Sequence, residues 1–493
     1  MILARNLLRP LSGSKTILFF AFLLISLSSC DLFKKIQDDD DTTVDTGDEL
    51  EPIQGRRVYD PETGTWVVVE EAVTEKMDTI AWQEVPTTDD PPITSTGESP
   101  ITGNQSNVID VTDFGSQILN NYNISVVLPW LTDRFNAMDP NIYYNSLWAI
   151  NYYNGTKMAL EVLANEGLNA TVSAMDSGAS PSTTSGLIRG SEDLGNAHLI
   201  VGPYRRDNVA LLAQYAQQRE KVLVSPQSAA SGISNLNPNY VQVNPTLETH
   251  SRAIIRHALE NHDPRNIVLV SKDVANEVSR FNYFRDEYAI WNRGRPATPL
   301  NELLIPENEA ASMERVNMAP LLQRSDTTVF IVPNWEETFV YALLRKIDVS
   351  RDPYSTVIVY GMPQWKDFEK IDFDYYEKLR VHISASVFVN SLDPKVKLFK
   401  EQYYDLYGAI PTEEAFVGYD VMLYFGRMLK KYGTKFQYAL EGEEADALHT
   451  HFAFERVVRP GTTSGIETSQ IEQFENKFVN ILKFENYQFQ KDN

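Results

Sequence analysis

The 493-residue sequence predicts an α/β fold of two lobes, each a parallel sheet flanked by helices. The first observation is a set of short apolar runs without polar alternation, among them ISVVL at 124–128, NIVLV at 266–270 and TVIVY at 356–360. Parallel strands give this pattern because helices cover both of their faces. The second observation is that amphipathic, helix-like segments separate these runs, as in βα repeats. The alternation restarts after VNPTLETH at 243–250, so we expect two lobes.

The first lobe is expected to begin with the strand at 124–128. Its other strands are apolar runs rich in β-branched residues, and its helices repeat apolar residues at spacings of three and four. The expected strands lie at 170–175, 198–202, 221–226 and 240–245, and the expected helices at 143–165, 185–194 and 208–219.

The second lobe follows the same criteria. Its strands are expected at 266–271, near Leu303, at 328–333 and at 356–361, and its helices at 249–261, 277–292, 312–322 and 335–346. This order alternates strand and helix throughout, so a parallel sheet is expected here too.

The N-terminus has the layout of a secretory signal peptide over residues 1–29. Three basic residues precede an apolar run from Thr16 to Leu27, which gives way to small residues. The run is about a dozen residues, whereas a spanning helix needs roughly 20. Leu27-Ser28-Ser29-Cys30 resembles the bacterial lipobox, whose cysteine becomes the first mature residue and carries the lipid. This resemblance implies several acyl chains on Cys30 and therefore a stable membrane anchor.

Residues 30–122 have the composition of a lipidated, acidic and disordered tether. From Asp31 to Tyr122 there are 21 acidic and 5 basic residues, an excess of 16 out of the net charge of −23. Such a segment buries too little apolar surface to offset the entropy of ordering. Within it, DPETGTW at 60–66 predicts the turn of a short hairpin, either a docking element or a transient structure. The remainder has no basic stripe, so nucleic acid is not an expected partner.

Three stretches resemble the type I periplasmic binding proteins, which include the leucine/isoleucine/valine receptors. They are LIVGPYRRDNVALLAQYAQQREKVLVSPQSAASGI at 199–233, YVQVNPTLETHSRAIIRHAL at 240–259 and EEAFVGYDVMLYFGRML at 413–429. The resemblance covers residues 123–493 and implies two Rossmann-like lobes joined by a hinge of three crossovers. It places lobe I at about 123–246 and 388–435, and lobe II at about 247–384 and 440–493.

A ligand is expected between the lobes, where the carboxyl ends of strands meet. The resemblance implies an aromatic contact at Trp130 and a hydroxyl contact at Ser228, although a tryptophan could equally pack a lobe edge and a serine could cap a helix. Tyr204, Arg205 and Arg206 stand where amino-acid receptors carry small polar residues, and Gln364 stands where they tend to carry an acid. Arg205 therefore favours a small polar, anionic ligand. The candidate ligand-binding residues are Trp130, Tyr204, Arg205, Ser225, Gln227, Ser228, Asn334, Trp335 and Gln364.

The motifs favour a binding protein over an enzyme. The folded part lacks G-x-S-x-G, H-E-x-x-H and a glycine-rich phosphate loop, and no cofactor is expected. Cys30 is the only cysteine, and once it carries lipid no thiol remains for a disulfide or a metal site. His449 and His451 could share one face of a strand, but without further ligands an exposed pair is expected and no metal.

Two functions remain open. The chain is either a lipid-anchored solute receptor that serves an ABC permease, or a protein-interaction lipoprotein of the kind that activates a cell-wall synthase. Both place it in the cell envelope, at the outer membrane, on the periplasmic or the surface-exposed side.

The lipobox generates a direct prediction. Cys30→Ala should leave an unlipidated precursor, because the acylated thiol is missing. Metabolic labelling with an alkyne fatty acid should mark the wild type and not the variant. Equal labelling of both proteins would show that the lipid is carried elsewhere.

Overall fold

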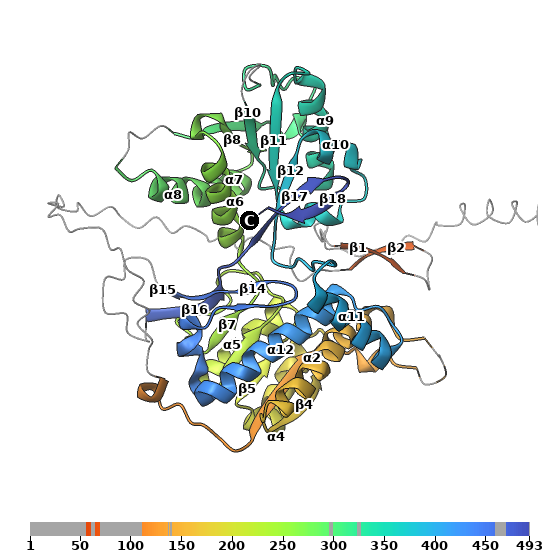
Figure 1. The fold of residues 1–493 in the computed structure, drawn as a ribbon, viewed down its shortest axis with the longest axis vertical. Helices are drawn as coiled ribbons and strands as arrows, with labels where there is room; N and C mark the ends of the chain where they lie inside the picture. Colours follow the sequence, from red (N-terminus) through yellow and green to blue (C-terminus); the bar gives the residue numbers. More distant parts are fainter. Residues whose placement is uncertain are drawn as a thin grey trace, which may run out of the picture. The chain divides into compact units, whose positions relative to one another are not determined.

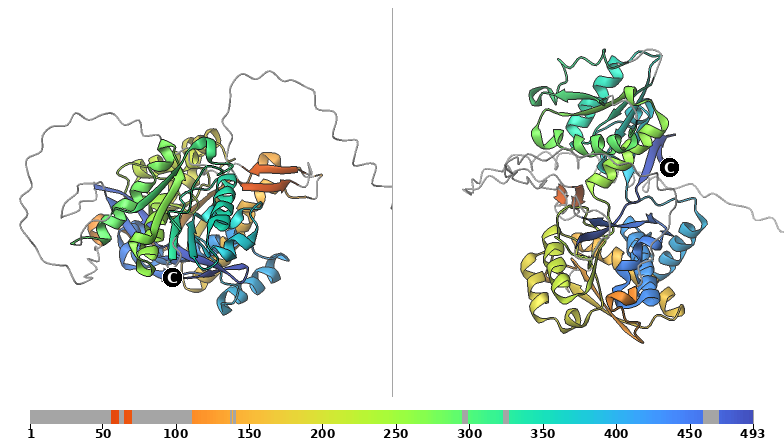
Figure 2. Two further views of the ribbon diagram at one scale, coloured as in Figure 1. Left: turned by 90° about the horizontal axis from the view of Figure 1, so that it is seen from above. Right: turned by 90° about the vertical axis from the view of Figure 1, so that its left-hand side faces the viewer.

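The computed structural model describes residues 56–60, 65–69, 111–136, 138, 141–294, 299–322, 327–458 and 470–492. The expected signal peptide at 1–29, Cys30 and most of the expected tether lie outside these residues. Within them, the chain forms two seven-stranded sheets, each with helices on its faces (Figures 1 and 2).

The first sheet has the strand order β15-β16-β7-β6-β5-β3-β4. All of its neighbouring pairs are parallel except β15 with β16. Its strands are β3 (Tyr122–Leu128), β4 (Ala170–Asp176), β5 (Leu199–Val201), β6 (Val222–Ser225), β7 (Tyr240–Gln242), β15 (Phe454–Val458) and β16 (Ile471–Asn476). The helices of this lobe are α2 (Leu147–Asn165), α3 (Pro181–Gly190), α4 (Glu192–Asn196), α5 (Arg206–Arg219), α11 (Pro394–Tyr407) and α12 (Glu413–Tyr432).

The second sheet has the order β18-β17-β12-β11-β10-β8-β9, with antiparallel pairing only at β12-β17 and β17-β18. Its strands are β8 (Ile267–Lys272), β9 (Asn301–Ile305), β10 (Thr327–Ile331), β11 (Thr356–Gly361), β12 (Val381–Ala385), β17 (Asn480–Glu485) and β18 (Gln488–Lys491). Its helices are α6 (Leu247–Asn261), α7 (Ala275–Val278), α8 (Phe281–Trp291), α9 (Glu337–Ser350) and α10 (Phe373–Lys378).

Shorter elements complete the described part of the chain. They are the 3-10 helices η2 (Val111–Phe114), η3 (Thr132–Arg134), η4 (Tyr144–Ser146), η5 (Pro264–Asn266), η6 (Glu307–Glu309), η7 (Pro363–Asp367) and η8 (Gly433–Gly442), and the strands β13 (Ala445–Asp446) and β14 (His451–Phe452). The expected hairpin is present as β1 (Arg56–Asp60) paired antiparallel with β2 (Thr65–Val69).

The first five strands of each lobe, counted along the chain, are parallel and have the same spatial order. Counted along the chain, it is 2-1-3-4-5 in both sheets, with the reversal next to β3 in the first and next to β8 in the second. Ligands of such sheets bind beyond the carboxyl ends of the strands near this reversal. The predicted fold class is therefore confirmed, and it places the candidate ligand edge of each sheet.

The lobe boundaries differ from the predicted ones at the C-terminal end. The sequence predicts that residues 440–493 lie in the second lobe, but β15 and β16 belong to the first sheet, where β16 pairs with β7. The chain crosses to the second lobe after β16, and β17 then pairs with β12. The sequence could not show which sheet each strand joins, because the pair β15 and β16 and the pair β17 and β18 have similar apolar patterns.

The expected tether is shorter than predicted at its C-terminal end. Val111 and Tyr122 are buried, and the ring of Phe114 stacks on Tyr438 at 4.1 Å between centroids. The Ser116 hydroxyl donates to the Tyr432 carbonyl at 2.5 Å, and Thr434 N donates to the Gln117 carbonyl. Residues 111–122 therefore belong to the first lobe, because a few apolar side chains and backbone hydrogen bonds fix them to η8.

The helix expected at 312–322 is absent, and turns replace it. Met313 has a positive φ of 56°, which a helix does not allow, and Pro320 lacks the amide hydrogen that a helix interior uses. The buried side chains of Met313 and Met318 are nevertheless apolar, which explains the helix-like pattern.

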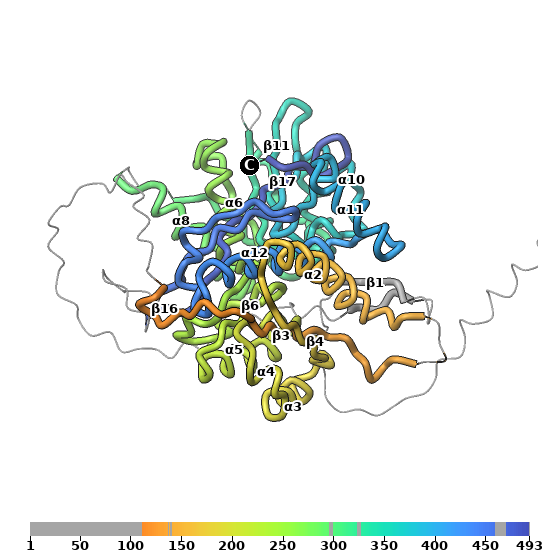
Figure 3. Tube along the Cα trace, turned by 60° about the horizontal axis from the view of Figure 1, so that its bottom comes forward, coloured from red at the N-terminus to blue at the C-terminus, as the bar shows by residue number. Residues whose placement is uncertain are grey.

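The helices α2 and α12 lie side by side in the first lobe (Figure 3). A Cβ atom on Gly418 would lie 2.0 Å from the Tyr152 carbonyl oxygen, and one on Gly155 would lie 1.9 Å from the Ala415 carbonyl oxygen. Both glycines therefore permit a backbone contact that any side chain would block. This contact fixes the position of α2 in the first lobe.

Gly418→Ala should therefore destabilise the protein. The added methyl group meets backbone rather than a movable side chain, and overpacking of this kind costs about 1–3 kcal/mol. Gly186→Ala on α3 is the control, because its Cβ would meet no atom within 4 Å and should stabilise the helix by roughly 0.5–1 kcal/mol. Urea unfolding measures both. A Gly418→Ala protein as stable as the wild type would contradict the close contact.

Candidate functional site

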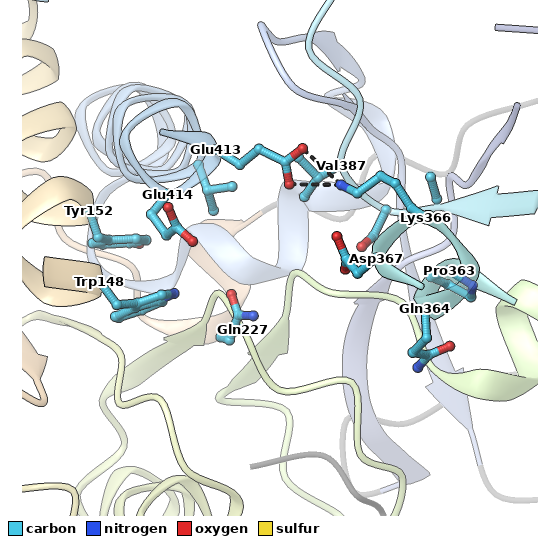
Figure 4. A pocket seen from close by; sticks show the side chains of 13 residues that line it. Trp148, Tyr152, Gln227, Pro363, Gln364, Lys366, Asp367, Val387, Glu413 and Glu414 are labelled. Atoms are coloured by element: carbon cyan, nitrogen blue, oxygen red, sulfur yellow. Dashed lines mark hydrogen bonds and ion pairs between the residues drawn. The ribbon is translucent and has the colours of Figure 1, made fainter. Parts of the chain in front are cut away.

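Two adjoining cavities of about 190 and 150 Å3 lie between the lobes. Both are lined by Gln227, Pro363, Gln364 and Ser386, so we treat them as one interlobe cleft with a larger and a smaller cavity. The larger cavity is also lined by Trp148, Tyr152, Lys366, Asp367, Ala385, Val387, Glu413, Glu414 and Val417 (Figure 4). The smaller is also lined by Tyr204, Ala229, Asn244, Pro245, Leu247, His250, Trp335 and Met362.

The first-lobe wall is aromatic. Trp148 and Tyr152 follow each other by one turn on α2 and stack with centroids 5.3 Å apart at an interplanar angle of 16°. Tyr204, after β5, meets Trp148 edge-on at 4.8 Å. Tyr152 is only 1% exposed and its hydroxyl has no hydrogen-bond partner among the described residues. Burial raises the pKa of this phenol, so the ring stays neutral.

The second-lobe wall is the segment η7, which follows β11. Its Trp365 is fully buried, and the indole Nε1 donates to the Asn334 carbonyl at 2.7 Å. The Tyr376 hydroxyl donates to the Trp365 carbonyl at 2.9 Å. These contacts hold η7 on the lobe, while its neighbours Gln364, Lys366 and Asp367 line the cleft.

One ion pair joins the two walls. Lys366 Nζ lies 2.8 and 2.9 Å from the carboxylate oxygens of Glu413, the first residue of α12 (Figure 4). Glu414 follows it on the first-lobe side. Both acids begin a helix, where negative charge is favourable. Glu413 and Glu414 therefore both stabilise the start of α12 and line the cleft.

Two of the three crossovers are tied together by Glu475, at the end of β16. Its buried Oε1 accepts hydrogen bonds from Thr246 N and Thr246 Oγ1, each at 2.8 Å, and from Thr249 Oγ1 at 2.7 Å. Its Oε2 accepts from Lys477 Nζ at 2.6 Å. Thr246 and Thr249 begin the second lobe, and Lys477 begins the last crossover. The carboxylate of Glu475 therefore connects the first and the last crossover between the lobes.

His250 lies beside this hinge network and lines the smaller cavity. It is 5% exposed, and its Nδ1 has no hydrogen-bond partner among the described residues. Burial lowers the pKa of this imidazole to about 4, although the charge of Glu475 acts in the opposite direction. At neutral pH the ring is therefore uncharged.

Solved structures share this arrangement of lobes. A protein from Rhodospirillum rubrum, described as a branched-chain amino acid ABC transporter, matches with a TM-score of 0.55 at 15% identity, over 75% of this chain and 100% of that one. An ABC transporter substrate-binding protein from Desulfitobacterium hafniense matches with a TM-score of 0.51 at 14% identity, over 76% and 100%. The chain has the type I periplasmic-binding-protein fold. No protein-family model and no curated protein matches the sequence.

Within the type I periplasmic-binding-protein fold, the structure brings four of the predicted site residues to the cleft. Tyr204, Gln227, Trp335 and Gln364 line it. Gln364 Oε1 is buried without a hydrogen-bond partner in the described part of the chain, and the Trp335 ring is covered on one face by Arg280 at 3.9 Å. These four residues follow strand ends, as expected, and their role in ligand binding stays a prediction.

The other five predicted residues are not among the lining residues. Trp130 packs edge-on against Tyr153 at 5.1 Å, and Arg205 is the residue before α5. Ser225 is buried in β6, and Ser228 Oγ accepts from Ala230 N at 3.4 Å. Asn334 is held by Glu277 and by Glu336 N. The expectation of an anionic ligand rested on Arg205. Because Arg205 does not line the cleft, the structure gives this expectation no support.

The sequence missed the residues that come from helices and hinge segments. Trp148, Tyr152, Glu413 and Glu414 do not follow a strand, so the rule of strand ends could not find them. Lys366 and Asp367 were within reach, because they follow Gln364 in the same segment. His449 is also different from the expected exposed residue: it is 2% exposed, and its Nδ1 lies 2.5 Å from Asp420 Oδ2.

The hinge network predicts that Glu475→Ala destabilises the protein strongly. The change leaves Lys477 and two threonine hydroxyls without their buried acceptor, and loss of one partner of such a pair costs about 3 kcal/mol or more. Glu475→Gln should cost less, because its amide oxygen can still accept from Thr246 and Thr249. Urea unfolding measures both free energies of unfolding.

Glu260→Ala, an exposed change on α6, is the control and should stay within about 0.5 kcal/mol of the wild type. Equal stability of the Glu475→Ala and Glu260→Ala proteins would show that the hinge does not depend on this carboxylate.

Proposed function

We propose that the chain is an extracytoplasmic solute-binding protein that closes its lobes on a small polar ligand and delivers it to an ABC permease. The observation that carries the proposal is the interlobe cleft, whose walls come from both lobes at the carboxyl edges of two parallel sheets. Small-molecule sites are typically built in this way, from aromatic surfaces and a few polar groups.

The polar groups of the cleft come from opposite walls. Gln227 follows β6 in the first lobe, and Gln364 follows β11 in the second. A ligand that contacts both amides is bound fully only when the lobes approach each other. Hinge closure of this kind couples binding to a change of shape that a permease can recognise.

The membrane anchor is a separate part of the proposal and rests on the sequence alone. Cys30 would carry the lipid, and the acidic segment after it would span the distance from the outer membrane to the folded lobes. In the residues that the structure describes, no helix has the length and apolar character needed to cross a bilayer.

Native mass spectrometry of the protein purified from its own host tests the proposal. We expect a retained small molecule in the wild type. The retained fraction should fall in a Gln227→Ala/Gln364→Ala protein, because the ligand loses hydrogen bonds from both walls. Gln214→Ala, an exposed change on α5, is the control and should retain the ligand as the wild type does.

Small-angle scattering provides the second readout, since release of the solute should increase the radius of gyration as the lobes open. A protein that carries no solute and does not change shape would contradict the proposal. That result would favour the alternative function, a lipoprotein that binds a cell-wall synthase.

A further inference from the structure

The larger cavity of the cleft carries uncompensated negative charge. One lysine and three carboxylates line it, and Lys366 is paired through two hydrogen bonds with Glu413. Asp367 and Glu414 form no hydrogen bond or ion pair with any residue that the structure describes through their carboxylates. Lys366 and Glu413 neutralise each other, so two carboxylates remain to face a ligand.

An aromatic surface lies next to one of these carboxylates. Figure 4 shows Glu414 beside the stacked rings of Trp148 and Tyr152, with Gln227 facing them. The face of an aromatic ring attracts a cation, and a neighbouring carboxylate adds to this attraction. The ring of Tyr152 stays neutral because burial raises its pKa.

The smaller cavity offers hydrogen-bond acceptors without adding positive charge. His250 is 5% exposed with an unpartnered Nδ1, and Gln364 Oε1 is buried without a partner among the described residues. The imidazole is neutral at pH 7, because burial lowers its pKa to about 4. A neutral imidazole nitrogen and an amide oxygen can each accept a hydrogen bond from a ligand N–H or O–H group.

The cleft offers little to a ligand carboxylate. Lys366 is the only lysine or arginine among the lining residues and is already paired. Arg205, Arg206 and Ser228 do not line the cleft. A carboxylate in the larger cavity would instead meet Asp367 and Glu414, and like charges repel.

We propose that the cleft selects a compact organic cation that lacks a carboxylate, such as a protonated or quaternary amine. The cationic group lies against Trp148 and beside Glu414, and the polar end of the solute reaches Gln364 and His250. This inference rests on the proposed solute-binding function and names the class of solute.

Calorimetry with the full-length chain and four probes of similar size tests the proposal. Choline is the cation, 3,3-dimethylbutan-1-ol is its uncharged counterpart of the same shape, glycine betaine is the zwitterion, and leucine represents the amino acids. We expect choline to bind at least tenfold more tightly than each of the other three, because only choline combines a positive charge with the absence of a carboxylate.

Single substitutions locate the site. Glu414→Gln should weaken choline binding at least tenfold, and Asp367→Asn should weaken it less, because Asp367 is more exposed. Glu161→Gln removes the same charge from the exposed side of α2, outside the cleft, and should leave binding unchanged. Equal losses in the Glu414→Gln and Glu161→Gln proteins would overturn the site, because the attraction would then come from the overall charge of the protein.

The remaining outcomes separate this inference from the proposed function. Binding of leucine or betaine, but not choline, would overturn the inference and leave a solute-binding protein. If no probe binds, the solute retained from the host decides: a cation without a carboxylate supports the inference, and any other solute overturns it. If no solute is retained either, the proposed function fails and the inference fails with it.

Discussion

The carboxylate of Glu475 is the contact on which the relation between the lobes depends. It is 3% exposed, and it accepts hydrogen bonds from both threonines that begin the second lobe and from Lys477 in the last crossover. A buried charge is costly unless such partners compensate it. The hydrogen bonds therefore fix two chain segments, 229 residues apart, in one geometry. His250 belongs to the same hinge, where burial lowers its pKa although the charge of Glu475 acts in the opposite direction.

The walls of the cleft are positioned by packing behind them. On the first-lobe side, glycines at 155 and 418 allow α2 and α12 to approach until backbone meets backbone, which places Trp148, Tyr152 and Glu414 together. On the second-lobe side, buried Trp365 fills the space above Gly361 and anchors η7. The cleft residues therefore lie on helices and turns that are packed closely against their own lobes.

The negative charge of the cleft comes from residues that also begin a helix. Glu413 and Glu414 occupy the first turn of α12, where the helix dipole favours negative charge. Because the N-terminus of α12 also borders the cleft, the same acids set the sign of its potential. Lys366 compensates one of them across the cleft and leaves the other available. The cleft therefore carries an excess of negative charge, whereas a cleft lined by an arginine would present positive charge to the ligand.

The sequence by itself determined the elements and the class of fold, because buried parallel strands such as β3 and β8 must be continuous apolar runs whatever their neighbours. It also indicated Tyr204, Gln227, Trp335 and Gln364, because strand ends of a doubly wound sheet always share one edge. Only the tertiary structure decided that β15 and β16 join the first sheet, that Arg205 stays outside the lining and that Glu414 lies beside Trp148. These relations join residues far apart in sequence, and they depend on pairing and packing geometry that local residue patterns do not specify.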